Sequence, residues 1–458
     1  MARLLISAAH KSSGKTTVTL GLCAALQKNN FKVQPFKKGP DYIDPMWLAL
    51  ASGRPCYNLD FFTQTHDEIT DLFDSKSTNA DISIIEGNKG LSDGLDLDGS
   101  NSSAALAKLL NVPVIMVIDT QGITRSVAPL LLGFQEFEPD VNIAGVILNK
   151  VGGSRHEEKL RRVLQEYTDI PVLGAIQRDP SLEIVERHLG LIPSNETASA
   201  HLLIKRISEN ITKQIDLERL VKIAAVADRP DNAPGLKPKR TSGLTIGILR
   251  DEAFGFYYPD DLEAFEQAGA SLVFIDAIND NQIAPIDGLF IGGGFPESRM
   301  KQLENNSKMR ALLRDKINNG LPVYAECGGL MYLSKGIHWQ DQYSEMLGVI
   351  DASSVMHDRP VGRGYVYLRK NEKHPWINGN IKGVHQQPAH EFHYSELKLN
   401  SSNNYFGFDV IRGKGIINKL DGFLINNIIA TYAHQRNTLS NPWINEFLEF
   451  VSRVKKQD

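Results

Sequence analysis

Residues 4–17 of the chain read LLISAAHKSSGKTT. The segment Leu4–Ser7 has the composition of a short buried strand, and a polar loop leads from it to the triplet Gly14–Thr16. Beyond this triplet, apolar residues recur at helical spacing, at Val18, Leu22 and Leu26. We therefore expect the triplet to lie at the N-terminus of a helix, in the strand, loop and helix order of a phosphate-binding P-loop.

The residue types in this loop suit phosphate chemistry. Backbone N–H groups and the helix dipole favour phosphate, the Lys15 ammonium can reach the β and γ oxygens, and the Thr16 hydroxyl can bind Mg²⁺. Ala9 stands where the strict P-loop pattern has glycine, so the prediction depends on the order of the elements. The alternative is an ordinary Ser/Gly turn that caps a helix. We predict a nucleotide site formed by Ser13, Gly14, Lys15, Thr16 and Thr17.

Short β-like runs alternate with amphipathic segments in both halves of the chain, which predicts parallel sheets covered by helices. Residues 229–243 carry three prolines and no apolar periodicity. We expect a linker there, between one domain at 1–228 and a second at 244–458. The expected strands are Leu4–Ser7, Phe31–Phe36, Ile82–Ile85, Val114–Ile118, Gly145–Leu148, Leu244–Leu249, Leu272–Ile275, Leu289–Ile291 and Val323–Ala325.

Composition narrows the class of protein. With 458 residues, 42% of them hydrophobic, the chain can form two cores of roughly 200 residues each. A formal charge of -4 gives no general electrostatic reason to expect nucleic acid or an acidic membrane as a partner. The scattered cysteines Cys23, Cys56 and Cys327 form neither a disulfide framework nor a CxxC metal site. Because signal-peptide and membrane-spanning runs are also missing, we expect a cytoplasmic protein that acts on small molecules.

A carboxylate ends one of the expected strands. Glu86 follows the apolar run Ile82–Ile85, and parallel sheets present ligand-binding groups at this carboxyl edge. Together with the P-loop, Glu86 is therefore a candidate Mg²⁺ ligand; taken alone, it has the alternative of a solvated or helix-capping acid. Two more acid-bearing loops, residues 37–45 and 90–94, have the alternative of simple turns rich in Gly, Pro and Asp.

The C-terminal half contains a thiol and an imidazole in suitable contexts. Residues 322–331 read PVYAECGGLM, an apolar strand that runs into a Gly-rich turn at Cys327 and then a helix. This pattern is typical of a nucleophile elbow, in which a strained turn exposes one side chain and the helix N-terminus favours thiolate. The alternative is a buried apolar cysteine. His434 ends another apolar run and is the candidate base, while Gly293 and Gly294 offer backbone amides for an oxyanion hole.

Several strings resemble the cobyrinate a,c-diamide synthase family, whose members are relatives of dethiobiotin synthetase within the P-loop amidoligases. The most specific string is Gly-Pro-Asp-Tyr-Ile-Asp-Pro at 39–45. The others are Asn58–Asp60, Glu86–Gly87, Gly90–Gly94 and Glu186–Leu191.

This resemblance implies roles at the first site. Tyr42 and Asp93 would shape the region of the substrate carboxylate. Asn149, at the end of an expected strand, matches the position that reads adenine, with an Asx turn as the alternative. ATP and Mg²⁺ would be held by Lys15, Thr16, Asp41 and Glu86.

Residues 244–440 resemble a class I glutamine amidotransferase domain. Cys327 would then form the γ-glutamyl thioester, His434 would shuttle the proton, and one of the two glycines would stabilise the tetrahedral oxyanion. Many such domains carry glutamate two residues after the histidine, whereas Arg436 stands there in this chain. Cobyrinate and cobyrate synthases lack this glutamate as well, which supports the narrower family and leaves open what orients His434.

Residues 389–395, AHEFHYS, resemble the segment Gly-His-Glu-Phe-His-Tyr-Ser of the same family. We do not expect the two histidines in it to bind zinc, because no third ligand accompanies them at metal spacing.

The resemblance covers nearly the whole chain and implies an α/β protein of two domains. The N-terminal domain would be a P-loop, dethiobiotin-synthetase-like parallel sheet with helices on both faces, and the C-terminal domain a class I glutamine amidotransferase. The implied substrates are L-glutamine, ATP and a tetrapyrrole carboxylate, first the a and c acetates of cobyrinate. Siroheme or another sirohydrochlorin-derived ring is the alternative, on account of departures at 10–13 and 254–255. The alternative from another class is a regulatory P-loop ATPase, which binds partners and makes no amide. Such a protein would not need Cys327 and His434 in a second domain. The oligomeric state is open, a homodimer included.

Overall fold

The computed structural model describes residues 2–182, 184, 186–187, 190–196, 199–225, 243–377, 386–401 and 404–456. The chain divides into two compact units, Met1–Gly235 and Leu236–Asp458. The division falls inside the segment 229–243 that we expect as a linker, of which the structure describes Gly243. Within the described ranges, none of the helices is long and apolar enough to cross a membrane.

The first unit is built on a seven-stranded sheet in the order β3-β2-β4-β1-β5-β6-β7, and all of its pairings are parallel. Its strands are buried along almost their whole length, as expected for a parallel sheet covered on both faces. The strands are β1 (Ala2–Ala8), β2 (Val33–Lys38), β3 (Tyr57–Leu59), β4 (Ile82–Glu86), β5 (Val114–Asp119), β6 (Ile143–Val151) and β7 (Val172–Gln177). A separate pair of two-residue strands consists of β8 (Glu186–Arg187) and β9 (Gly190–Leu191).

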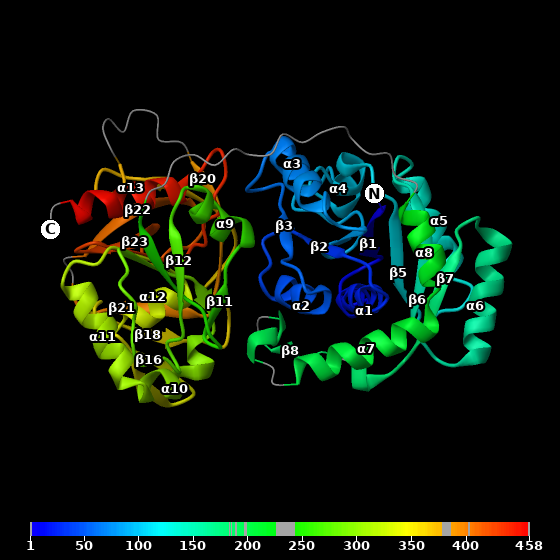
Figure 1. Ribbon diagram of the computed structural model, residues 1–458. Coiled ribbons are helices and arrows are strands. Elements are labelled where there is room, and N and C mark those ends of the chain that lie inside the picture. The colour runs from blue at the N-terminus through cyan, green and yellow to red at the C-terminus, as the bar shows by residue number, and fades with distance from the viewer. Residues whose placement is uncertain are drawn as a thin grey trace. The chain divides into compact units, whose positions relative to one another are not determined.

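Helices cover both faces of this sheet. Figure 1 shows α1, α2 and α7 on one face and α3 and α4 on the other. The helices are α1 (Lys15–Lys28), α2 (Ile43–Ser52), α3 (His66–Ser77), α4 (Ser103–Leu110), α5 (Val127–Phe137), α6 (Ser154–Tyr167), α7 (Ala200–Gln214) and α8 (Leu217–Ala224). The expected strand at Phe31–Phe36 is displaced: Phe31 and Lys32 precede β2, which runs on to Lys38.

The strand order gathers the candidate residues of the first unit at one edge of the sheet. In a parallel sheet, the loops that follow the carboxyl ends of neighbouring strands meet, and ligands bind there. The loop after β1 leads into α1, the loop after β2 contains residues 39–42, and β4 ends on Glu86. Because β4 and β5 flank β1 and β2 flanks β4, these loops lie side by side.

The second unit has a nine-stranded sheet in the order β12-β10-β13-β15-β24-β23-β22-β19-β20. Pairings from β12 to β24 are parallel and those from β24 to β20 are antiparallel. The strands are β10 (Thr245–Leu249), β12 (Ser271–Ile275), β13 (Gly288–Ile291), β15 (Val323–Glu326), β19 (Gly362–Lys370), β20 (Gln387–His393), β22 (Tyr405–Arg412), β23 (Leu420–Ile425) and β24 (Ile428–Thr431).

Two smaller sheets accompany it. One pairs β11 (Phe254–Phe256) with β14 (Gly293–Gly294). The other has the order β17-β16-β18-β21 and consists of β16 (Gly336–Trp339), β17 (Gln342–Glu345), β18 (Ala352–Met356) and β21 (Ser395–Leu399).

The nine-stranded sheet of the second unit has a core on each face. Leu289 and Ile291 of β13 belong to one core, whereas Phe290 between them belongs to the other, as the alternation of a strand requires. The helices of this unit are α9 (Pro259–Gln267), α10 (Met300–Asn305), α11 (Ser307–Asn318), α12 (Gly328–Leu333) and α13 (Trp443–Lys455). The first core also holds Leu313 and Leu330, and the second core also holds residues of α9 and α13.

A glycine in the middle of α1 sets how closely α7 packs against it, and this gives a test of the fold. A Cβ at Gly21 would overlap Ile211 Cγ1 and lie 2.8 Å from Ile207 Cγ2. We expect Gly21→Ala to lower the urea midpoint of the first unit, because overpacking costs about 1–3 kcal/mol, more than the gain of about 1 kcal/mol in helix propensity.

Gly133 in α5 provides the matched control, since a Cβ there would have no neighbour within 4 Å among the residues that the structure describes. Gly133→Ala should therefore raise the urea midpoint. An unchanged or higher midpoint for Gly21→Ala would contradict the packing of α1 against α7.

Candidate active sites

The loop between β1 and α1 has the backbone of an anion-binding turn. Ser12 and Gly14 adopt positive φ angles of 66° and 85°, and Lys15 is the first residue of α1. The Ser13 hydroxyl donates to the carbonyl of His10 over 2.8 Å, which ties the loop to itself. Such a loop directs backbone N–H groups toward one point beyond a helix N-terminus, where phosphate is favoured.

Asn149, which we expect to contact adenine, lies directly against this loop. Its Nδ2 donates to the carbonyl oxygen of Ser13 over 2.8 Å, and a Cβ at Gly14 would overlap that nitrogen. The neighbouring Lys150 Nζ donates to the carbonyl of Ser12 over 3.1 Å and pairs with Asp119 at 2.7 Å. The end of β6 therefore supports the P-loop; the contact of Asn149 with adenine stays a prediction.

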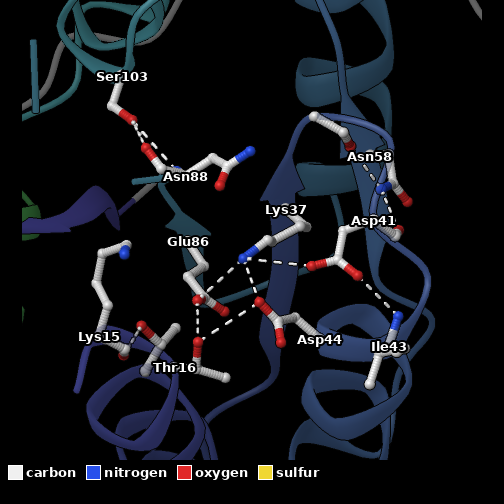
Figure 2. Close-up of polar contacts among 12 residues, drawn as sticks. Lys15, Thr16, Lys37, Asp41, Ile43, Asp44, Asn58, Glu86, Asn88 and Ser103 are labelled. Atoms are coloured by element: carbon white, nitrogen blue, oxygen red, sulfur yellow. Dashed lines mark hydrogen bonds and ion pairs between the residues drawn. The ribbon is translucent and has the colours of Figure 1, made fainter. Parts of the chain in front are cut away.

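A hydroxyl, an ammonium and carboxylates converge beside the P-loop, as Figure 2 shows. Thr16 Oγ1 donates to Glu86 Oε1 over 2.6 Å, and Lys37 Nζ donates to this glutamate oxygen over 3.1 Å. Lys37 also donates to Asp44, whose Oδ2 lies 3.4 Å from Thr16 Oγ1. The pairing of β2 with β4 places Lys37 opposite Glu86, so the register of the sheet brings the two charges together.

The charges in this cluster depend on one another. Burial lowers the pKa of Lys37, but the carboxylates of Asp44, Glu86 and Asp41 outweigh it and raise the pKa above the ordinary value. Burial raises the pKa of Asp44, and Lys37 outweighs that effect and holds the pKa below the usual range. Burial raises the pKa of Glu86. Burial and the charge of Lys37 lower the pKa of Lys15, against the opposing effects of the nearby acids.

The acids from the loops occupy different positions around Lys37. Asp41 lies 3.8 Å from Lys37 Nζ and accepts the backbone N–H of Ile43 over 2.9 Å. Asp44 belongs to the string 39–45 but received no role from the sequence; its Oδ2 lies 3.4 Å from Thr16 Oγ1. In the described part of the chain, no three His, Cys, Asp or Glu side chains are arranged as a preformed metal site.

The residues expected near the substrate carboxylate lie in the flanking loops. Tyr42 precedes the first residue of α2 and is buried. Asp93 accepts the backbone N–H of Gly90 over 2.9 Å, which closes the turn after β4, and its charge acts on Lys15. Thr17, in the first turn of α1, is half-buried.

Cys327 stands at a sharp turn between β15 and α12. Its backbone has φ 47° and ψ -100°, a conformation that costs free energy in a residue other than glycine and occurs at nucleophile elbows. A Cβ at Gly328 would lie 3.0 Å from the Gly294 nitrogen, and a Cβ at Gly329 would lie 2.9 Å from Ile291 Cγ2. The two glycines after Cys327 therefore allow the turn to approach the loop after β13.

His434 follows β24 and lies beside the same loop. A Cβ at Gly293 would lie 2.5 Å from His434 Cε1, so this glycine leaves room for the imidazole. The His434 Nδ1 is 3.3 Å from Glu326 Oε2. Burial lowers the pKa of His434, but hydrogen bonds with the Cys327 and Glu326 side chains and their charges outweigh it and raise the pKa to about 10. The structure thus brings together Cys327, His434 and the two expected glycines.

The segment 389–395 supports the strand end that carries His434. The backbones of His390 and His434 exchange hydrogen bonds of 3.2 and 2.7 Å, and their rings stack at 4.9 Å. The ring of His393 stacks on Tyr432 at 3.8 Å. Ser395 donates its hydroxyl to that of Tyr432 over 3.0 Å. The motif therefore holds the segment 432–434 in place.

Family models match both units. Residues 5–192 match the CobQ/CobB/MinD/ParA nucleotide binding domain, and residues 245–440 match the CobB/CobQ-like glutamine amidotransferase domain. The chain is therefore an α/β protein that joins a nucleotide-binding domain to a glutamine amidotransferase domain.

Similar proteins specify the family further. A cobyrinate a,c-diamide synthase of Magnetococcus marinus is 44% identical over 440 residues, which cover 94% of this chain and 93% of that protein. A cobyrinate a,c-diamide synthase of Methanosarcina acetivorans is 39% identical, over 94% of this chain and 92% of that protein. One of Listeria innocua is 37% identical, over 95% of this chain and 96% of that protein. The chain belongs to the cobyrinate a,c-diamide synthase family.

The packing of Asn149 on the P-loop predicts the effect of one added methyl group. We expect Gly14→Ala to abolish binding of a fluorescent ATP analogue, because a Cβ at this positive φ would also displace the Asn149 amide. Binding is measured by titration, and the melting temperature is recorded alongside it.

Gly53, at the C-terminal end of α2, is the control. It has a similar φ of 69°, yet a Cβ there would meet no described atom within 4 Å. Gly53→Ala should cost roughly 1–2 kcal/mol of stability through backbone strain alone and leave nucleotide binding intact. Equal loss of binding in both variants would contradict the role given to the contact with Asn149.

Proposed function

We propose that this chain uses ATP and glutamine to convert the a and c acetate carboxylates of cobyrinate into amides. The observation that carries the proposal is the pairing, in one chain of this family, of a P-loop site in the first unit with a thiol and imidazole site in the second. An ATP-activated carboxylate needs a nitrogen nucleophile, and glutamine hydrolysis supplies ammonia.

In the first unit, the residues suit activation of a carboxylate by phosphoryl transfer. The amides of Ser13 to Thr17 and the Lys15 ammonium would bind the phosphates of ATP, and Asn149 would approach the adenine. Tyr42 and Asp93 lie in the loops beside them, where the substrate carboxylate would bind. Attack of that carboxylate on the γ-phosphorus gives an acyl phosphate and ADP, and ammonia then displaces phosphate to form the amide.

The acids of this site suit a magnesium ion. Thr16, Glu86, Asp44 and Asp41 supply the hydroxyl and carboxylate oxygens that Mg²⁺ prefers. Among the described residues, Glu86 Oε2 is a buried oxygen that has no hydrogen-bond partner, as expected for a ligand of a cation. When bound, Mg²⁺ would neutralise charge on the phosphates of ATP. Lys37 keeps these carboxylates together.

In the second unit, the residues suit release of ammonia from glutamine. With a pKa of about 10, His434 is protonated at neutral pH and favours a thiolate at Cys327. The thiolate attacks the side-chain amide carbon of glutamine, and the N–H groups of Gly293 and Gly294 would stabilise the oxyanion. The proton on His434 passes to the departing nitrogen, so ammonia leaves and a γ-glutamyl thioester remains for hydrolysis by water.

The three cysteines are unpaired, which suits the reducing cytoplasm in which we place this reaction. Parallel incubations with ATP, Mg²⁺, glutamine and either cobyrinate or siroheme test the substrate. Mass spectrometry should show two amidations of cobyrinate; amidation of siroheme alone would overturn the choice of ring.

The two half-reactions should be separable by substitution. Lys15→Ala should lower amide synthesis by about 10²–10³-fold, because it removes the cation that faces the transferred phosphoryl group, while glutaminase activity persists. Cys327→Ser should lose glutamine-dependent synthesis by more than about a thousandfold, yet amidate cobyrinate with ammonium at alkaline pH. Product formation is followed by mass spectrometry and glutamate release by a coupled assay.

Each variant serves as the control for the fold of the other. Loss of the ammonium-dependent reaction in a folded Cys327→Ser protein would contradict the separation of the sites. Full glutamine-dependent activity in that variant would show that Cys327 is a core residue.

The magnesium assignment gives a further prediction. Glu86→Gln keeps the size of the side chain and removes an anionic oxygen, so the Mg²⁺ concentration for half-maximal synthesis should rise about tenfold or more. Glu136→Gln, on the exposed part of α5, should leave the Mg²⁺ dependence unchanged. A Mg²⁺ titration with ammonium as the nitrogen source separates this effect from glutamine hydrolysis, and wild-type dependence in Glu86→Gln would exclude Glu86 as a ligand.

A further inference from the structure

We propose that Glu326 is the residue that positions His434, in place of the glutamate that many class I amidotransferases carry two residues after the histidine. The inference rests on the proposed roles of Cys327 and His434. It answers a question that the sequence leaves open, because position 436 is an arginine.

Glu326 is held at the end of a buried strand next to the nucleophile. It is the last residue of β15, and the pairing of β15 with β24 sets it opposite Thr431, three residues before His434. Its side chain is 2% exposed. Glu326 Oε2 lies 3.3 Å from His434 Nδ1, so the carboxylate contacts the imidazole at this ring nitrogen.

The other carboxylate oxygen is engaged by two donors that fix its orientation. Glu326 Oε1 accepts the Tyr324 hydroxyl over 2.7 Å and the backbone N–H of Gln435 over 2.8 Å. The Gln435 side chain in turn donates to the Tyr324 oxygen over 2.8 Å. These three residues are all buried, so the ring of hydrogen bonds has little freedom to rearrange. Because Oε1 is engaged, Oε2 remains directed at His434.

This geometry determines what the imidazole can do. A carboxylate at Nδ1 stabilises a proton there and leaves Nε2 to exchange a proton with the thiol and the departing ammonia. His390, which stacks on His434, does not compete as a cation, because burial and the charges of His434 and Arg436 hold its pKa well below the ordinary value. The side chains of Cys327 and Glu326 are the neighbours that raise the pKa of His434.

Two other charged residues near His434, Arg436 and Asp421, bind other groups. Arg436 is buried, donates to Asp260 over 2.8 Å and lies over the ring of Tyr258. Asp421 accepts the backbone N–H groups of Tyr432 and Ala433, at 3.0 and 3.1 Å, and so orders the backbone before His434. Glu326, in contrast, brings its carboxylate to the imidazole itself.

The test is Glu326→Gln, which keeps the shape of the side chain and removes its charge. We expect kcat for glutamine hydrolysis to fall about a hundredfold with little change in KM. The reaction of Cys327 with iodoacetamide should slow at neutral pH, and its pH profile should move to higher pH, because the imidazolium that favours the thiolate is weakened. A purely structural role would not move this profile. Ammonium-dependent synthesis should remain at the wild-type rate.

Two tyrosine variants complete the design. Tyr324→Phe keeps the ring and removes the hydroxyl that orients Glu326, so it should shift the profile in the same direction by a smaller amount. Tyr332→Phe is the matched control, since the buried Tyr332 hydroxyl has no hydrogen-bond partner in the described part of the chain, and its profile should match the wild type.

The outcomes distinguish this inference from the proposed function. Wild-type kcat and alkylation profile in a folded Glu326→Gln protein, with Cys327→Ser inactive toward glutamine, would overturn the role of Glu326 alone. Glutaminase activity in Cys327→Ser would overturn the site on which the inference rests. If Glu326→Gln does not fold, Tyr324→Phe decides, and a wild-type profile in that variant overturns the inference.

Discussion

A buried carboxylate at the last residue of a parallel strand organises each candidate site. Glu86 ends β4 and Glu326 ends β15, and both side chains are almost fully buried. An isolated buried charge costs several kcal/mol, so each carboxylate must have a cation or several donors beside it. Glu86 forms an ion pair with Lys37 and accepts a hydrogen bond from Thr16. Glu326 contacts the imidazole of His434 and accepts hydrogen bonds from Tyr324 and Gln435. The requirement to pair these charges places the reactive groups next to one another.

The order of local elements made much of this arrangement predictable. A strand, a loop with Gly14 and a helix that begins at Lys15 occur where the sequence pattern indicates them, and the turn at Cys327 joins a buried strand to a helix. Such predictions succeed because they depend on neighbours in the chain: the loop conformation requires glycine or a small residue, and the apolar run requires burial. Membership of the family agrees with these local patterns.

What the sequence did not reveal depends on pairing between distant segments. Lys37 belongs to the first site because β2 pairs with β4 and places Lys37 opposite Glu86. Asp44 belongs to it because the first turn of α2 lies next to Thr16 in the first turn of α1. The antiparallel strands β19, β20, β22 and β23 alternate buried and exposed residues only in part, and their short runs gave no strong periodicity. Asn149 shows the same limit, since its contact with Ser13 joins residues 136 positions apart.

The second site illustrates why geometry, and not sequence spacing, identifies the residue that positions a catalytic histidine. Moving the acid from two residues after the histidine to the residue before the nucleophile changes its sequence position but keeps a carboxylate beside the imidazole. Position 436 is then free for a different task. Its arginine pairs with Asp260, while the adjacent Asp261 accepts the N–H of Asn437 and the indole N–H of Trp443. These contacts anchor the chain just beyond His434 to α9 and α13. The segment that carries the base is therefore held from both ends, by Asp421 before the histidine and by Asp260 and Asp261 after it.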